Sequence, residues 1–154
     1  MLEYKPATVD QYDALFQLIK SDAADYLQQT LELMKMNWEQ FADLFRTVGK
    51  VSGIYQDGCL AGFYWIEERE KILHLHGLIL DARFRGQGIG TPVLQMLIAR
   101  YQDDMDAIEL GVHQSNEGAI RLYQRLGFEV VAVRDDLGYF IMQKLLMINP
   151  VKEI

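Results

Sequence analysis

The sequence has 154 residues, of which 50% are hydrophobic and 24% charged, a composition typical of one globular domain with its own core. A formal net charge of −7 at pH 7 argues against broad contact with nucleic acid or with an anionic membrane, because both require clustered lysines and arginines. The single cysteine, Cys59, excludes an internal disulfide, and the sequence has neither a charged, apolar leader nor an apolar run of about 18 residues. We therefore expect a single domain over residues 1–154, with no membrane span and a cytoplasmic location.

The first half of the chain predicts a short strand, two helices and a hairpin. The stretch "EYKPAT", residues 3–8, reads as a strand, and Thr8 and Gln11 have the spacing of a capping box at a helix start. Residues 51–58 and 59–68 flank the pair Asp57-Gly58, which tolerates the positive φ angles of a tight hairpin turn. Apolar side chains at helical spacing mark one face of each helix: Tyr12, Leu15, Phe16 and Ile19 on the first, and Trp38, Phe41, Phe45 and Val48 on the second.

The second half alternates strands and helices. A third strand over residues 71–80, joined to the second through the charged turn "EEREK", runs directly into "RFRGQGIG", residues 83–90. A helix over residues 91–101 follows, with Pro92 in its first turn, where the missing N–H is not needed. The chain closes with a buried strand, a helix and two further strands, expected over residues 105–112, 116–126, 127–134 and 138–146. This order predicts a mixed sheet with helices on its faces, an α/β fold in the broad sense.

Three glycines, Gly86, Gly88 and Gly90, stand between the third strand and its helix. Such a turn leaves backbone N–H groups unpaired at the positive end of a helix, where an anion's oxygens can approach a main chain without Cβ atoms. Arg85 brings a full positive charge to the same turn. A dinucleotide fingerprint is excluded because Thr91 stands where its third glycine belongs, and no stretch of the chain fits a P-loop. The turn therefore predicts an anion site of another kind.

Two motifs carry a resemblance to a known family. Arg85, Gly88 and Gly90 form R-x-x-G-x-G, which resembles the pyrophosphate-binding signature of the GNAT superfamily of acyl-coenzyme A-dependent N-acetyltransferases. Residues 110–128 resemble a later motif of the same superfamily, and the resemblance runs from about Leu60 to Leu146, with residues 1–50 matching only in element type. It implies a mixed, mostly antiparallel sheet of about six or seven strands flanked by about four helices. The matching positions of the later motif are Asn116, Ala119, Tyr123, Gly127 and Phe128.

The resemblance implies acetyl-CoA (acetyl-coenzyme A) as cofactor and a site for it. Backbone amides of the glycine turn would hold the pyrophosphate, and the strand positions Leu78 and Leu80 would bind the cofactor's amide arm through their backbone, with side chains in the core. Asn116 would bond that arm or cap its own helix, since an Asn before a helix does both. The turn residues that would contact the cofactor are Arg85, Gly86, Gln87, Gly88, Ile89, Gly90 and Thr91.

The resemblance also assigns catalytic roles. Tyr123 occupies the place where many members keep a tyrosine near the thioester sulfur, as general acid or polariser of the leaving thiolate. His76 stands where many members place a glutamate base, and a neutral imidazole accepts a proton at cytoplasmic pH. Glu67 or a water is an alternative base, although the charged run that Glu67 begins is expected to form a solvated turn. His74, two residues before His76, is a weaker candidate, and His113 is expected to face solvent.

The function that follows is transfer of an acetyl group from acetyl-CoA to a primary amine by direct attack in a ternary complex. The amine-bearing acceptor is expected between the two N-terminal helices and the closing strands, and a homodimer is compatible with the family. A metal site is not expected, because His74 and His76 lack a third ligand. The alternative function is a catalytically weak sensor that binds acyl-coenzyme A. The side chains expected around the acceptor are Tyr26, Trp38 and Tyr139, with Asp22, Asp25 and Glu39.

Overall fold

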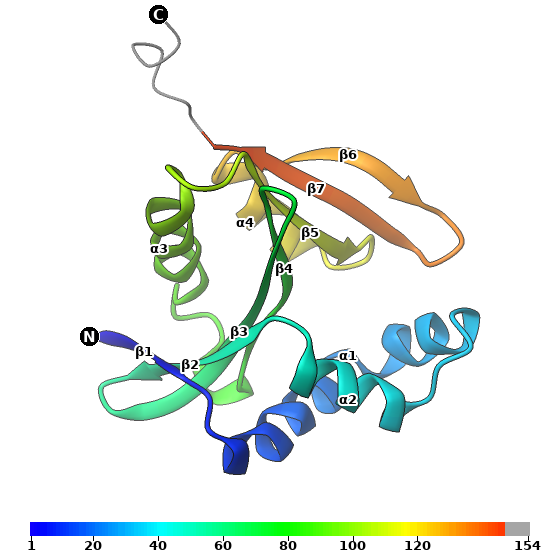
Figure 1. Cartoon of the computed structure of the whole chain (residues 1–154), viewed down its shortest axis with the longest axis horizontal. Coiled ribbons are helices and arrows are strands. Elements are labelled where there is room, and N and C mark those ends of the chain that lie inside the picture. Colours follow the sequence, from blue (N-terminus) through cyan, green and yellow to red (C-terminus); the bar gives the residue numbers. More distant parts are fainter. Residues whose placement is uncertain (147–154) are drawn as a thin grey trace, which may run out of the picture. The chain divides into compact units, whose positions relative to one another are not determined.

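The computed structural model of the chain describes residues 1–146, apart from the side chains of residues 22–26. The described residues form seven strands and four α-helices (Figure 1). Their order is strand, two helices, three strands, helix, strand, helix and two strands, as the sequence predicts. The elements are β1 (Leu2–Pro6), α1 (Tyr12–Leu33), α2 (Trp38–Thr47), β2 (Lys50–Gln56), β3 (Cys59–Arg69), β4 (Ile72–Leu80), α3 (Gly90–Tyr101), β5 (Ala107–His113), α4 (Glu117–Arg125), β6 (Glu129–Arg134) and β7 (Tyr139–Leu145).

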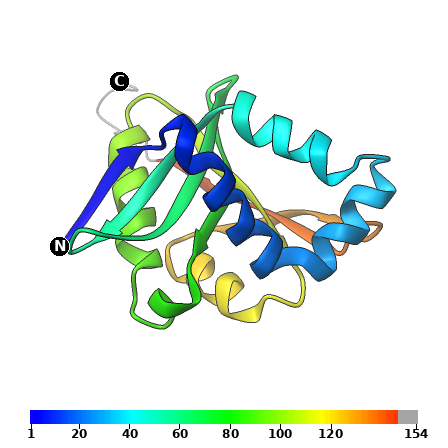
Figure 2. The same ribbon diagram turned by 90° about the horizontal axis from the view of Figure 1, so that it is seen from below.

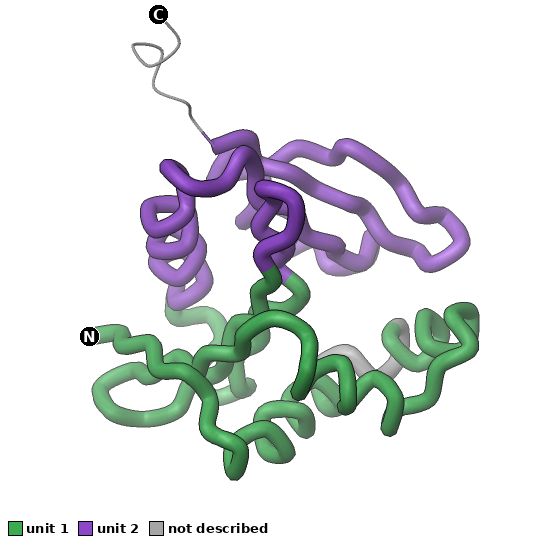
Figure 3. Tube along the Cα trace, in the orientation of Figure 1, with its two compact units in different colours: residues 1–67, 76–87 green, residues 68–75, 88–154 purple. Residues whose placement is uncertain are grey.

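The strands form a seven-stranded sheet in the order β1-β2-β3-β4-β5-β7-β6. The pairs β1–β2, β2–β3, β5–β7 and β6–β7 are antiparallel, and β4 runs parallel to β5. The expected mixed and mostly antiparallel sheet is therefore confirmed. The chain divides into two compact units, residues 1–67 with 76–87 and residues 68–75 with 88–154 (Figure 3). Strand β4 contributes to both, and the single domain expected from chain length stays a prediction.

The core of the first unit lies between the two N-terminal helices and the β2–β3 hairpin. Helix α2 turns back after α1 (Figure 2), and Phe45 of α2 packs with Phe16 of α1 and with Phe63 and Trp65 of β3. These rings lie within a cluster of buried side chains, as the predicted helix faces require. The further buried members of the cluster are Leu15, Ile19 and Val51.

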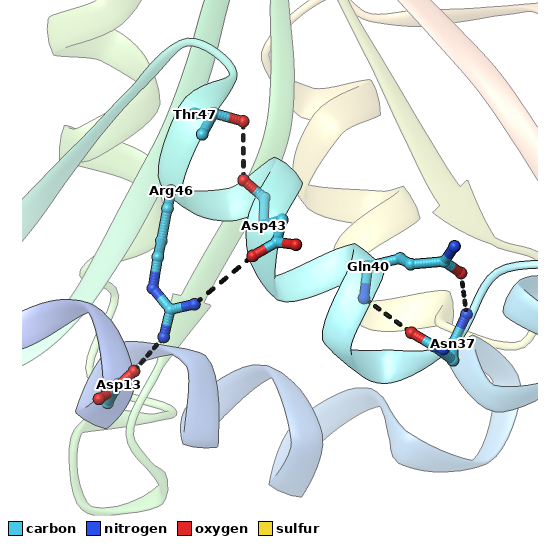
Figure 4. Close-up of polar contacts among 6 residues, drawn as sticks. All are labelled: Asp13, Asn37, Gln40, Asp43, Arg46 and Thr47. Carbon is cyan, nitrogen blue, oxygen red and sulfur yellow. Dashed lines mark hydrogen bonds and ion pairs between the residues drawn. The ribbon is translucent and has the colours of Figure 1, made fainter.

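Helix α2 is fixed at both ends by polar contacts (Figure 4). At its start the Asn37 side chain accepts a hydrogen bond from the Gln40 backbone N–H at 2.8 Å, and the Gln40 side chain accepts one from the Asn37 N–H at 2.9 Å. In its last turn Arg46 pairs with Asp13 of α1. The helix ends one residue earlier than predicted, because Val48 has an extended backbone.

The predicted hairpin and the close approach of its second strand to β4 both depend on glycine. Asp57 and Gly58 have φ angles of 51° and 85°, as a tight turn between β2 and β3 requires. Further along β3, a Cβ at Gly62 would lie 2.1 Å from the carbonyl oxygen of Ile79 in β4. Only a residue without a side chain lets the two backbones approach so closely.

The β3–β4 connection differs from the prediction. The charged residues "EEREK" are expected to form a turn, but β3 continues to Arg69, and the turn is made by Glu70 and Lys71, with φ angles of 52° and 67°. Glu67, which is predicted both within the hairpin segment 59–68 and at the start of the charged turn, belongs to β3. A sequence window cannot place this boundary, because strand length is set by the hydrogen bonds of the neighbouring strands.

The second unit is built on β5, which pairs with β4 over residues 72–75 on one side and with β7 on the other. Buried side chains from β5, α3 and β7 form its core, among them Leu94, Ile108 and Met142. Within residues 1–146, strand β6 pairs only with β7, and it has a bulge between Val130 and Ala132. Helix α3 packs on α4 at Gly90, where a Cβ would lie 3.1 Å from the Leu122 side chain.

Candidate active site

The turn between β4 and α3 presents bare backbone to solvent. Gly86 and Gly88 have φ angles of 75° and 76°, a left-handed conformation that side chains disfavour. A Cβ added at either would meet nothing within 4 Å, so packing does not explain these glycines. Both residues are exposed. The feature that requires glycine here is the backbone conformation, and the result is a stretch of N–H groups that an anion can approach.

The other glycine of the turn has a different reason. Gly90 begins α3 and lies against Leu122, so its lack of a Cβ serves helix packing. Ile89, which precedes it, is 4% exposed and anchors the turn in the core. The side chain of Ile89 therefore faces away from solvent, and its contact with a ligand would be through backbone. The first turn of α3 supplies unpaired N–H groups and the positive end of the helix dipole.

The chain before the glycines is held by its own side chains. The carboxylate of Asp81 accepts hydrogen bonds at 3.0 Å from the backbone N–H and from Nε of Arg83. These bonds hold the pKa of the Asp81 carboxyl below its ordinary value. Arg85 Nε donates to the Leu80 carbonyl oxygen at 3.0 Å, and the Gln87 amide donates to the Arg83 carbonyl oxygen at 3.0 Å. These hydrogen bonds within the chain support the conformation of the turn.

His76 and Glu67, the two alternative bases, are hydrogen-bonded to each other. His76 Nε2 lies 2.8 Å from Glu67 Oε1, and their side chains are 30% and 22% exposed. The imidazole ring lies 5.0 Å from the Trp65 ring, measured between ring centroids. Trp65 was not predicted to lie beside His76 and Glu67. Its position two residues before Glu67 indicates that both side chains are on the same face of β3.

His74 lies in a different environment from His76. Its Nδ1 is 3.4 Å from Oε2 of Glu109 on β5, and its Nε2 is 3.5 Å from the Arg69 guanidinium. The other oxygen of Glu109 accepts a hydrogen bond from Gln143 of β7 at 2.9 Å. His74 is thus part of a cross-strand polar network. Among residues 1–21 and 27–146, whose side chains are described, no group of three or more His, Cys, Asp or Glu side chains is placed to hold a metal ion.

Helix α4 carries the remaining predicted site residues. Asn116 precedes it and accepts a hydrogen bond from the Ala119 N–H at 3.3 Å, so its capping role is confirmed. Tyr123 is half-buried, with its ring 5.7 Å from that of Phe128. His113 is half-buried rather than solvent-facing, because Nδ1 lies 2.7 Å from Ser115 Oγ and the ring packs 5.3 Å from Tyr139.

The remaining predicted site residues lie in β4, in α3 and in the two N-terminal helices. Leu78 and Leu80 are half-buried in β4 and do not belong to the fully buried core. Thr91 lies in the first turn of α3. Trp38 donates to the Gln28 side chain at 2.6 Å and packs against Phe16, while Glu39 lies in the exposed first turn of α2. The side chains of Asp22, Asp25 and Tyr26 lie outside the described residues.

Comparison with known proteins gives the family. A model of the acetyltransferase (GNAT) family matches residues 12–128, well over half of the chain. The mycothiol acetyltransferase of Propionibacterium freudenreichii subsp. shermanii is 30% identical over 102 residues, which cover 63% of this chain but only 32% of that protein. The spermine/spermidine N(1)-acetyltransferase of Bacillus subtilis is 32% identical over 105 residues, which cover 62% of this chain and 69% of that enzyme.

A solved structure shares the fold over nearly the whole chain. The PaiA N-acetyltransferase of Thermoplasma acidophilum, solved in complex with coenzyme A, matches with a TM-score of 0.70 at 17% identity and covers 94% of this chain and 99% of that one. Among the described residues no helix has the length and apolarity to cross a membrane. The predicted fold class is confirmed, the predicted acyltransferase class is that of the matching family, and the chain belongs to the acetyltransferase (GNAT) family.

Proposed function

We propose that this chain transfers an acetyl group from acetyl-CoA to a primary amine by direct attack of the amine on the thioester. The observation that carries the proposal is the exposed pair Gly86 and Gly88, whose left-handed backbone leaves space where any other residue would place a Cβ. A diphosphate fits such a turn, because its oxygens accept hydrogen bonds from closely approaching N–H groups. Arg85 adds a positive charge beside them.

His76 accepts the proton of the attacking amine in this proposal, and Glu67 orients His76. When Nε2–H donates to the Glu67 carboxylate, the imidazole lone pair is on Nδ1, which becomes the proton-accepting atom. The carboxylate also stabilises the imidazolium that forms when the proton is taken up. The two alternative bases predicted from the sequence thus have complementary roles: His76 is catalytic, and Glu67 positions it. Trp65 limits the positions available to the imidazole ring by packing 5.0 Å from it.

Tyr123 donates a proton to the departing thiolate. The amine nitrogen forms a bond to the carbonyl carbon, the carbon–sulfur bond breaks, and the sulfur takes up a proton as the amine loses one. The exposed Cys59 takes no part, since direct attack forms no acyl-enzyme. Asn116, already bonded to its helix, has a second lone pair on Oδ1 and its amide N–H groups for the cofactor arm.

A cationic amine is the acceptor class that the charge of the chain favours. The net charge of −7 raises the local concentration of cations near the protein. The similarity to a spermine/spermidine N(1)-acetyltransferase makes polyamines the first compounds to test. Amino acids and peptides with a free N-terminus complete the panel, because their amines undergo the same reaction.

The proposed function is tested by thermal melting with acetyl-CoA followed by a thiol-release assay with the amine panel. Acetyl-CoA at about 100 times its Kd should stabilise the folded chain by about 2.7 kcal/mol and raise the melting temperature. Thiol release that depends on the amine would then identify the acceptor. A thermal shift without thiol release for any amine would support the alternative function, a sensor that binds acyl-coenzyme A. No shift would contradict the cofactor site itself.

The paired roles of His76 and Glu67 are tested by a double-mutant cycle. His76→Ala should lower kcat by about 100-fold or more, as loss of a general base does. Glu67→Gln preserves size but removes the charge, and we expect it to lower kcat by about ten-fold in the presence of His76 and to have no effect in its absence. Glu68→Gln, the same change at the next and exposed residue of β3, is the matched control.

A separate readout distinguishes positioning from folding. The ¹⁵N shifts of the His76 ring report which nitrogen carries the proton, and Glu67→Gln should mix the two tautomers because an amide both donates and accepts. Unchanged ring shifts in Glu67→Gln, or an equal loss of kcat whether His76 is present or absent, would contradict the positioning role. The Kd for acetyl-CoA should remain unchanged in each variant, so failure of this role is distinguishable from failure of the cofactor site.

A further inference from the structure

His113 ends β5, where the chain turns toward α4, and its side chain is bonded to that turn. Its Nδ1 accepts a hydrogen bond from the Ser115 backbone N–H at 3.2 Å and lies 2.7 Å from the Ser115 hydroxyl oxygen. The carbonyl oxygen of His113 accepts a hydrogen bond from the Asn116 N–H at 2.9 Å. The side chain and the carbonyl of one residue thus bind the last two residues before α4.

These two hydrogen bonds have the pattern of an Asx turn. In such a turn an Asn or Asp side chain accepts the backbone N–H of the residue two positions later, while its carbonyl accepts the N–H three positions later. His113 stands at the first position, and its Nδ1 replaces the Oδ1 of an asparagine, because both atoms are bonded to Cγ. A backbone N–H only donates, so Nδ1 carries no hydrogen and the neutral ring has its hydrogen on Nε2.

The β6–β7 turn holds the imidazole ring in this position. The Tyr139 ring packs edge-on against it, with ring centroids 5.3 Å apart and ring planes at 85°. A Cβ added at Gly138 would lie 3.0 Å from Nε2 of His113, so the backbone of this turn runs close to the imidazole. The N–H of Gln114 donates to the Gly138 carbonyl oxygen at 2.9 Å. Two turns that are separate in the sequence therefore meet at His113, which is half-buried.

The β5–α4 turn determines where Asn116 lies. Asn116 closes the turn, and its Oδ1 accepts a hydrogen bond from the Ala119 N–H at 3.3 Å. A group that must be ordered when a ligand binds lowers the affinity, whereas a group that is already held in place does not. The hydrogen bond to Nδ1 of His113 therefore favours binding of any ligand that contacts the Asn116 side chain.

We propose that His113 is a positioning residue for acetyl-CoA: its Nδ1 fixes the β5–α4 turn and so presents Asn116 to the amide arm of the cofactor. This role rests on the proposed function, in which Asn116 binds that arm. His113 acts through the turn and does not itself contact the cofactor. The imidazole is used here as a hydrogen-bond acceptor for backbone, in contrast to His76, whose imidazole is proposed to accept a proton.

Two substitutions with the same branched shape test the hydrogen bond. His113→Asn keeps an acceptor bonded to Cγ, whereas His113→Leu has none. Both lose the ring that packs against Tyr139, so a difference between them reports the acceptor. His113→Leu should raise the Kd for acetyl-CoA about five- to ten-fold, as expected for the loss of one hydrogen bond, and His113→Asn should stay within about two-fold of the wild type. His113→Gln, whose amide lies one bond further from Cα, should resemble His113→Leu.

A truncated ligand distinguishes positioning from a general effect on the fold. Adenosine 3′-phosphate 5′-diphosphate has the nucleotide and the diphosphate of coenzyme A but lacks the amide arm. Its Kd, measured by calorimetric titration, should therefore be the same in the wild type and in all three variants. The ¹⁵N shifts of the His113 ring in the wild type should show that Nδ1 carries no hydrogen. If His113→Leu does not fold, the comparison of His113→Asn with His113→Gln makes the same test.

Three results would overturn this role of His113. The first is the same Kd for acetyl-CoA in His113→Leu, His113→Gln and His113→Asn, and the second is a protonated Nδ1 in the wild type. The third is an equal loss of affinity for acetyl-CoA and for the truncated ligand in His113→Leu, which would show a structural role alone. A wild type that binds neither ligand would contradict the proposed cofactor site itself and this role with it, and that failure is recognised before any variant is made.

Discussion

Replacing Gly88 by alanine distinguishes two reasons for a glycine at this position. The first is conformational, because φ is 76° there, and the second is the open space proposed for phosphate oxygens. Gly58, in the β2–β3 turn, provides a matched control. Its φ is 85°, and a Cβ there would likewise meet nothing within 4 Å. Alanine therefore introduces similar backbone strain at both positions, but only Gly88 belongs to the proposed cofactor site.

The expected magnitudes follow from this geometry. A side chain in the left-handed region destabilises the fold by about 1–2 kcal/mol, so both variants should melt about 2–8 °C below the wild type in a chain of this length. A ten-fold loss of affinity in Gly88→Ala would lower the stabilisation by acetyl-CoA from about 2.7 to about 1.4 kcal/mol at the same ligand concentration. The thermal shift on adding ligand should thus fall by about half, whereas Gly58→Ala should retain the full shift.

The assay is thermal melting of the two variants and the wild type with and without acetyl-CoA, supported by calorimetric titration of the ligand. Equal loss of stability in the two variants with selective loss of affinity in Gly88→Ala is the expected result. An unchanged affinity in Gly88→Ala would refute the assignment of the turn to the pyrophosphate. An equal loss of affinity for acetyl-CoA in both variants would mean that general destabilisation of the fold, and not a lost cofactor contact at Gly88, weakens binding.

Three further predictions concern chemistry, pH and packing. Tyr123→Phe should lower kcat by about 100-fold or more with little change in the Kd for acetyl-CoA, and a fully active variant would mean that the hydroxyl takes no part in proton transfer. Hydrogen bonds from Arg83 lower the pKa of Asp81 below 3.8, so this carboxylate stabilises the fold above that pH and loses its effect as pH falls through the lowered value. Asp81→Asn should therefore lower the melting temperature at pH 7 and make no difference in strong acid; a constant difference at all pH values would contradict this. Gly62→Ala should destabilise the chain by about 1–3 kcal/mol, because the added Cβ would clash with the backbone of β4. The control Gly77→Ala, in which the added Cβ makes ordinary contacts, should melt close to the wild type. Equal melting temperatures of the two variants would be inconsistent with the close approach of β3 and β4.

Local sequence patterns predicted most of the helices and strands, because these patterns depend on backbone conformation and side-chain periodicity within a short segment. The Asp57-Gly58 pair predicted the hairpin, since few other residues adopt two successive positive φ angles. Leu15, Phe16 and Ile19 predicted the buried face of α1 because helical periodicity determines which side chains share a face. The sequence showed the three glycines of the β4–α3 turn, but it did not show that they are needed for different physical reasons. Gly90 serves packing on Leu122, a contact between two helices that no sequence window contains.

The sequence by itself determined the order of strands and helices, the family and the residues of the proposed site, because these depend on periodicity, turn chemistry and motif spacing within short stretches. Only the tertiary structure decided that β3 continues to Arg69 and that the carboxylate of Glu67 binds His76, so that two alternative bases became one hydrogen-bonded pair. It likewise decided that β6 lies at the edge of the sheet with its valines exposed. The physical reason is the same in both cases: strand ends, cross-strand partners and exposure are set by pairing between segments far apart in the chain.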